Sequence, residues 1–87
     1  MEEQKLTKKK LSIGGIDQLT LFGSGDEHLR YIENNFDAKI VARGSEITII
    51  GQPAEIAQLE LVFKELIAMI ERNSGINLSD VRTVVDV

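Results

Sequence analysis

The sequence predicts one α+β domain, in which a three-stranded sheet is covered on one face by three helices. Two β-rich runs flank the turn pair Gly44-Ser45, and two other segments carry apolar residues at helical spacings of three and four. The chain has 87 residues, of which 43% are hydrophobic and 28% are charged. A chain of this length and composition has room for a single hydrophobic core, so we expect one domain.

The N-terminal part is expected to hold a flexible arm and a first strand. Residues 1–9 are polar, charged and aperiodic, which indicates an arm rather than a packed element. Residues 10–13 are typical of a short strand, with Leu11 and Ile13 on one face, and Gly14-Gly15 then breaks the chain.

A short helix is expected next, over residues 16–22. Asp17 is a typical N-cap residue, whose side chain accepts a hydrogen bond from a free backbone amide of the first turn. Within this helix, Leu19 and Phe22 are expected to point inward.

The second helix has a clearer start, because Ser24 and Glu27 match the capping box that often opens a helix. Leu29, Ile32 and Phe36 follow at spacings of three and four and form one apolar stripe. This stripe predicts an amphipathic helix that packs one side against the sheet.

A hairpin and a long helix complete the predicted core. Residues 39–43 and 46–50 read as antiparallel strands around Gly44-Ser45. Pro53 is suited to the first turn of the long helix, and residues 73–75 supply its stop. The broad apolar face of this helix spans about five turns and comprises Ile56, Leu59, Val62, Phe63, Leu66, Ile67 and Ile70.

We assign residues 10–75 to the domain and residues 76–87 to a tail. The tail is expected to contain a short helix from residue 80 to about residue 85, with Val81 and Val84 on one side. Its apolar pattern continues to Val87, which suggests a strand completed elsewhere or a piece of a longer protein.

The predicted order, β-α-α-β-β-α, is the layout of a type I KH fold. KH domains bind nucleic acid through a G-x-x-G loop, which usually contains a basic residue. The corresponding loop here consists of Gly23, Ser24, Gly25 and Asp26. An acidic residue therefore replaces the second glycine, and the loop contains no Lys or Arg. Phosphate approaching this loop would meet Asp26 and Glu27.

Charge also argues for weak nucleic-acid binding. The net charge is −4, and four of the ten basic residues lie in the first ten positions. Residues 11–87 therefore carry 6 basic and 12 acidic side chains, whereas phosphate binding draws on Lys and Arg. Arg30, Lys39 and Arg43 are candidates for a small basic edge beside the loop, and ordinary solvent-facing charges are the alternative.

Other candidate sites are better explained by structure. We expect His28 to be solvated in the first helical turn, Tyr31 to border the core, and Asp26 and Glu27 to cap a helix rather than hold Mg²⁺. The absence of cysteine and the single histidine argue against a structural zinc site. We therefore expect no catalytic residue, metal or cofactor in this chain.

Two substitutions follow from these assignments. Changes such as Gly23→Asp in the loop are expected to leave folding largely intact. Phe63→Ala, in the face of the long helix, is expected to cost about 3 to 5 kcal/mol.

Three pieces of the chain resemble the N-terminal domain of PhoH-like proteins, and the resemblance runs from about residue 10 to residue 85. They are residues 11–15, then Leu21-Phe22-Gly23 with Leu29 and Ile32-Glu33, then residues 39–44 with Glu46-Ile47 and Ile50-Gly51. The resemblance implies a KH-like domain that precedes a P-loop ATPase domain. ATP and Mg²⁺ would bind to that other domain, because this chain lacks G-x-x-x-x-G-K-[ST].

The resemblance implies a non-catalytic accessory domain that assists RNA binding or positions the ATPase domain. Its expected partners are that C-terminal ATPase domain, RNA bound weakly, and further copies through a homo-oligomeric parent. Met69, Val84, Val85 and Val87 are the candidates for contact with the missing part. Two alternatives stay open: an interaction or self-assembly module without RNA binding, and a stand-alone, weak RNA-binding KH module.

Neither a signal peptide nor a run of 18 apolar residues is present in the sequence. We therefore expect a cytoplasmic protein without a membrane partner.

Overall fold

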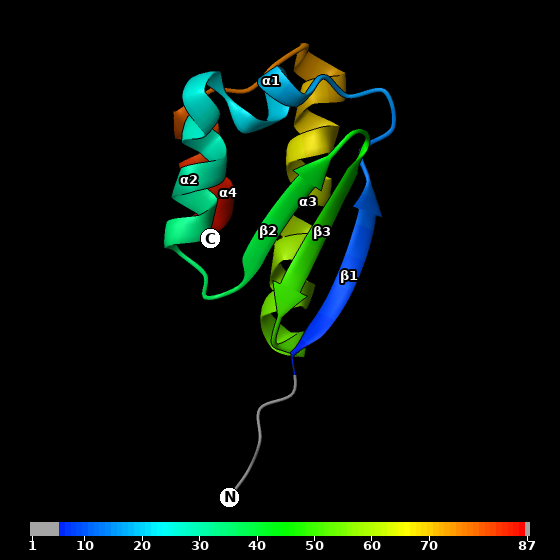
Figure 1. Ribbon diagram of the computed structural model, residues 1–87. Coiled ribbons are helices and arrows are strands. Elements are labelled where there is room, and N and C mark those ends of the chain that lie inside the picture. The colour runs from blue at the N-terminus through cyan, green and yellow to red at the C-terminus, as the bar shows by residue number, and fades with distance from the viewer. Residues whose placement is uncertain (1–5, 87) are drawn as a thin grey trace, which may run out of the picture.

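The computed structural model describes residues 6–86, in which a three-stranded sheet lies in front of the longest helix (Figure 1). The α+β class and the order β-α-α-β-β-α are as predicted, with a 3₁₀ helix added between the first two α-helices. The elements are β1 (Thr7–Ser12), α1 (Gln18–Phe22), a 3₁₀ helix η1 (Ser24–Asp26), α2 (Glu27–Asn34), β2 (Lys39–Arg43), β3 (Glu46–Gly51), α3 (Pro53–Asn73) and α4 (Leu78–Asp86).

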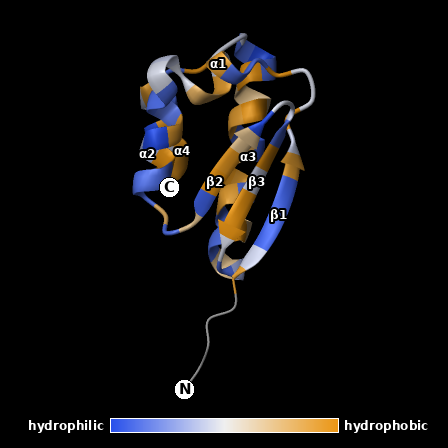
Figure 2. Ribbon diagram, viewed as in Figure 1, coloured by the Kyte–Doolittle hydropathy of each residue, from blue (hydrophilic) through white to orange (hydrophobic). Residues whose placement is uncertain are grey.

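The sheet is antiparallel, with strand order β1-β3-β2. β2 and β3 form the predicted hairpin, and Gly44 in its turn has φ +57°. Ile47 and Ile49 of the central strand are fully buried, and they face Leu11 and Ile40 on the neighbouring strands. This side of the sheet packs on α3, and in Figure 2 much of β2, β3 and α3 has hydrophobic colouring whereas most of β1 is hydrophilic.

β1 begins three residues earlier than predicted. Residues 7–9, which the sequence assigns to a flexible arm, pair with β3 from Thr7 opposite Gly51 onward. A row of exposed lysines carries no local strand signal. The strand reaches Thr7 because the backbone groups of these residues pair with those of β3. The remainder of the expected arm, residues 1–5, lies outside the described residues.

The predicted face of α3 forms the centre of the core. Phe63, Leu59 and Leu66 are fully buried, and only Ile67 of the predicted set is partly exposed. The helix ends at Ser74, which adopts the left-handed conformation with φ +67°. The stop therefore lies within the predicted residues, although Ser74 rather than Gly75 takes the strained position.

α1 forms as predicted but turns a different side inward. Asp17 caps it, accepting a hydrogen bond from the backbone N–H of Thr20 at 3.1 Å. Phe22 is buried as expected, whereas Leu19 is 65% exposed and Leu21 takes its place in the core. A helix of five residues has too little periodicity for the sequence to fix its rotation.

The predicted capping box of α2 does not form. Gly25 and Asp26 both adopt left-handed conformations, with φ of 63° and 60°. These two residues bend the chain between Ser24 and α2, which begins at Glu27 without a side-chain cap.

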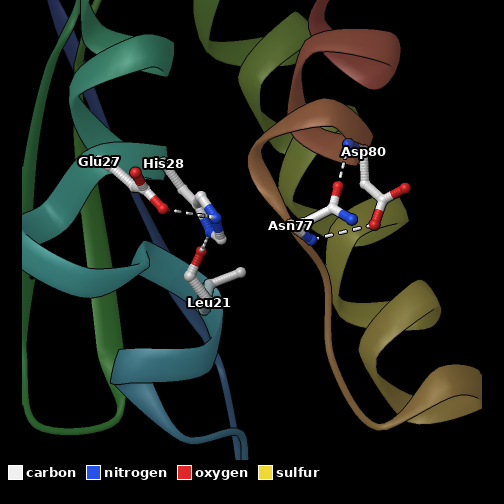
Figure 3. A network of polar contacts seen from close by, with 5 residues as sticks. All are labelled: Leu21, Glu27, His28, Asn77 and Asp80. Atoms are coloured by element: carbon white, nitrogen blue, oxygen red, sulfur yellow. Dashed lines mark hydrogen bonds and ion pairs between the residues drawn. The ribbon is translucent and has the colours of Figure 1, made fainter.

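A reciprocal cap is found instead at the start of α4 (Figure 3). The Asn77 Oδ1 accepts from the Asp80 N–H at 2.9 Å, and the Asp80 Oδ2 accepts from the Asn77 N–H at 3.0 Å. α4 packs against α2 and α3, and its Val81 is fully buried. The predicted tail helix is thus longer than expected and contributes to the core.

Candidate functional site

The loop at Gly23, Ser24, Gly25 and Asp26 offers little to a phosphate group. The Asp26 N–H donates to the Gly23 carbonyl at 3.1 Å, and the Glu27 N–H donates to the Ser24 carbonyl. Both acidic residues at this turn are exposed. Two amides are therefore already used within the loop, and the neighbouring charges repel an anion.

His28 is buried, so the prediction of a solvated side chain is wrong. Only 3% of it is exposed, and its Nδ1 lies 3.0 Å from the Leu21 carbonyl oxygen (Figure 3). Because a carbonyl oxygen only accepts, Nδ1 must carry the hydrogen of this bond. The contact ties the start of α2 to α1, which is a structural role.

The space for His28 depends on the missing side chain of Gly23. A Cβ at Gly23 would lie 2.9 Å from the Cγ and Cδ2 atoms of the His28 ring and 2.9 Å from the Glu27 Cγ. The expectation that Gly23→Asp leaves folding intact is therefore wrong. Sequence reasoning missed the available signal, namely that His28 stands four residues before Ile32 on the buried stripe.

The three predicted basic residues do not share one element. Lys39 and Arg43 lie at the two ends of β2 and are both exposed, and four residue steps along the strand place them about 13 Å apart. Arg30 is exposed on α2. The expected basic edge thus consists of two side chains on one strand and a third on a separate helix.

A groove lies where α2, α3 and α4 meet. It has a volume of about 820 Å³ and includes Leu61, which is 68% exposed. The residues that line it are Asn35, Phe36, Gln58, Leu61, Val62, Glu65, Thr83, Val84 and Val85. Five of these lining side chains are apolar and four are polar.

Two of the four predicted contact residues, Val84 and Val85, line this groove. Met69 does not line it, although it too packs, partly buried, against the core. Val87 lies outside the described residues. Leu61 was missed by the sequence analysis, although an apolar side chain outside the core stripe of α3 is a signal for such a surface.

Tyr31 links α2 to α4 through a hydrogen bond. Its ring packs against the core, as predicted, and its hydroxyl donates to the Asp86 Oδ1 at 3.0 Å. This hydroxyl is thus engaged within the protein, and the side chain is held against the domain rather than extended toward a base.

Two further classes of site were sought over residues 6–86. In that part of the chain, no three His, Asp or Glu side chains gather in a way that could hold a metal ion. No helix there has the length and apolar character needed to cross a membrane.

Comparison with known proteins gives consistent matches to one group. A PhoH-like protein of Mycobacterium tuberculosis (strain ATCC 25618 / H37Rv) is 39% identical over 62 residues, which cover 71% of this chain and 18% of the relative. A PhoH-like protein of Mycobacterium leprae is 38% identical over 50 residues, covering 58% of this chain and 14% of the relative. One from Synechocystis sp. is 28% identical over 65 residues, covering 75% and 20%.

No family model and no solved structure matches the chain. The chain spans about a fifth or less of the length of these curated relatives. The similarity to the Mycobacterium tuberculosis relative nevertheless covers 71% of this chain, and the family agrees with the resemblance seen in the sequence. The chain is therefore similar to a short part of PhoH-like proteins, which is consistent with a fragment or domain of such a protein.

Proposed function

We propose that this chain is a KH-like, non-catalytic accessory domain that docks on the remainder of a PhoH-like protein through the groove between α2, α3 and α4. The observation that carries the proposal is the exposed Leu61 beside Val84 and Val85 in a groove of about 820 Å³. Exposed apolar side chains gathered on one surface are typical of a protein interaction site.

The topology supports the KH-like part of the proposal. The order β-α-α-β-β-α and the antiparallel sheet order β1-β3-β2 are those of a type I KH fold. The match to a small part of much longer relatives supports the accessory role. In this proposal the P-loop ATPase domain of the parent binds ATP and Mg²⁺, and the present domain positions it.

The proposal is tested by mixing the 87-residue chain with the remainder of the same PhoH-like protein, produced as a separate polypeptide. Titration calorimetry would measure their association. Leu61→Gln should weaken it at least tenfold, because it places an amide that must be desolvated at the centre of the contact. Leu19→Gln is the matched control, since Leu19 is equally exposed, at 65%, but lies outside the groove.

Equal affinity of the wild type and Leu61→Gln would overturn the docking role. Sedimentation of the chain alone separates the alternative of self-assembly. The apparent molecular mass of the wild type would then rise to that of a dimer as concentration increases, whereas Leu61→Gln would stay a monomer. This result would assign the groove to a second copy of the chain instead.

A further inference from the structure

One face of the sheet is not covered by a helix and carries four basic side chains. In Figure 1 the three strands lie in front of α3, and no helix lies in front of them. Lys8 and Lys10 on β1 and Lys39 and Arg43 on β2 are all exposed. We call this the outer sheet face.

The strand register shows that these four side chains share one face. On β3, Ile47, Ile49 and Gly51 are buried, so the alternate residues point away from the core. Residues directly opposite one another in a ladder lie on the same face. Lys8 and Lys39 both stand opposite Ile50, Lys10 opposite Thr48, and Arg43 opposite Glu46.

The middle lysine of β1 confirms the alternation. Lys9 stands opposite the buried Ile49, and its Nζ lies 3.8 Å from the Glu60 Oε2 of α3, on the covered side of the sheet. Lys8 and Lys10 therefore point the other way. Among the described residues, no carboxylate lies within 4.0 Å of the amines of Lys8 and Lys10.

The outer sheet face is positive on a protein that is negative overall. It carries four basic side chains and one acidic side chain, Glu46, whereas the whole chain has a net charge of −4. The bases stand on the two edge strands and flank an uncharged centre of Val41, Thr48 and Ile50. Because neighbouring strands lie about 4.8 Å apart, the two basic rows are separated by about 10 Å.

We propose that the outer sheet face binds the phosphodiester backbone of a single-stranded nucleic acid without reading its bases. Lysine is depleted and aromatic residues are enriched at protein interfaces, so a lysine-rich face without an aromatic ring does not favour a protein partner. Lys and Arg are instead the groups that neutralise phosphates. The face offers no aromatic platform for base stacking, so we expect binding that tolerates changes of sequence.

This site is separate from the acidic loop and from the docking groove. The groove is lined by residues of α3 and α4 and by the two residues that follow α2, whereas the outer sheet face consists only of strands. The inference therefore does not rest on the docking role. Leu61→Gln should leave nucleic-acid binding unchanged, so failure of one proposal is distinguishable from failure of the other.

The test uses fluorescence anisotropy of a labelled oligouridylate of about 12 nucleotides, a length within known single-strand site sizes. Each phosphate contact on a single strand contributes a slope of about −0.7 in log affinity against log salt concentration. At about 50 mM salt, one contact therefore raises the affinity about eightfold relative to about 1 M salt. Lys8→Thr and Lys10→Thr should each weaken binding by about that factor and flatten the slope by about 0.7.

Lys9→Thr is the matched control, because it removes the same charge from the same strand on the covered side. It should change affinity less than twofold. Threonine keeps β propensity, and circular dichroism would verify that each variant is folded.

Four results would overturn the proposal. Equal weakening by all three lysine variants would show that only net charge matters, and a loss of affinity with Arg30→Gln but not with Lys8→Thr would place binding beside the loop. Tighter binding of duplex RNA, or of polyglutamate of equal charge, would contradict a site for single-stranded nucleic acid. The fourth result is no binding at about 1 mM protein, a concentration above the range of non-specific dissociation constants.

Discussion

Replacing Gly23 by alanine should destabilise the domain much more than replacing Gly25, although both residues have positive φ. Gly23 has φ 85° and ψ 168°, a region that is essentially restricted to glycine and costs other residues about 1 to 3 kcal/mol. Its added Cβ would also lie 2.9 Å from two atoms of the buried His28 ring. Overpacking of this kind typically costs about 1 to 3 kcal/mol, so we expect a total loss of about 2 to 6 kcal/mol.

Gly25 provides the control because its surroundings are open. Its φ is 63° and ψ is 24°, the left-handed α region, and a Cβ there meets no atom within 4 Å. Gly25→Ala should therefore cost only about 1 to 2 kcal/mol. A chain of 87 residues is expected to have a stability of about 4 to 13 kcal/mol, so the Gly23 variant loses a large share of it.

Urea unfolding followed by circular dichroism in the helical band measures both losses under the same conditions. The double variant Gly23→Ala, His28→Ala then isolates the steric contact, since removing the ring should make the double loss smaller than the sum of the single losses by about 1 kcal/mol or more. Equal losses for Gly23→Ala and Gly25→Ala would refute the steric argument. Strict additivity with His28→Ala would refute it as well.

The remaining predictions concern the core, a cap and a close contact. Phe63→Ala should cost about 3 to 5 kcal/mol in urea unfolding, because the side chain is fully buried, and a variant of unchanged midpoint would contradict the core assignment. Asn77→Ala should cost about 1 kcal/mol and increase amide exchange at the start of α4, whereas uniform exchange along the helix would speak against the cap. Gly51→Ala should lower the melting temperature, because its Cβ would lie 2.7 Å from the Cβ of Ala38, and Gly75→Ala, with open surroundings, should change it less.

The proposed accessory role would connect these features without requiring chemistry in the chain itself. Burial of His28 against α1 removes the histidine from the surface and leaves the loop with two acids. The groove and the outer sheet face are then the two surfaces of the described residues with a distinct character, one apolar and one basic. Under the two proposals, such a domain would contact the rest of a PhoH-like protein through the groove, and its outer sheet face would bind a nucleic-acid backbone.

The sequence by itself determined those elements whose signals are local. The hairpin follows from two β-branched runs around Gly44, and α3 follows from its apolar stripe with Pro53 at the start. Helical periodicity and turn geometry depend on residues within four positions of each other, so these patterns are complete in the chain. The family resemblance was readable for the same reason, since it depends on residue identity alone.

Only the tertiary structure decided where polar or short segments belong. β1 reaches Thr7 because β3 supplies its hydrogen-bond partners, and His28 is buried because Gly23 leaves space for its ring. The groove exists because α4 packs on α2 and α3, and Lys8 and Lys10 join Lys39 because the register places them on one face. Each of these features depends on atoms that are distant in the sequence, and their burial and alignment are set by long-range packing rather than by local pattern.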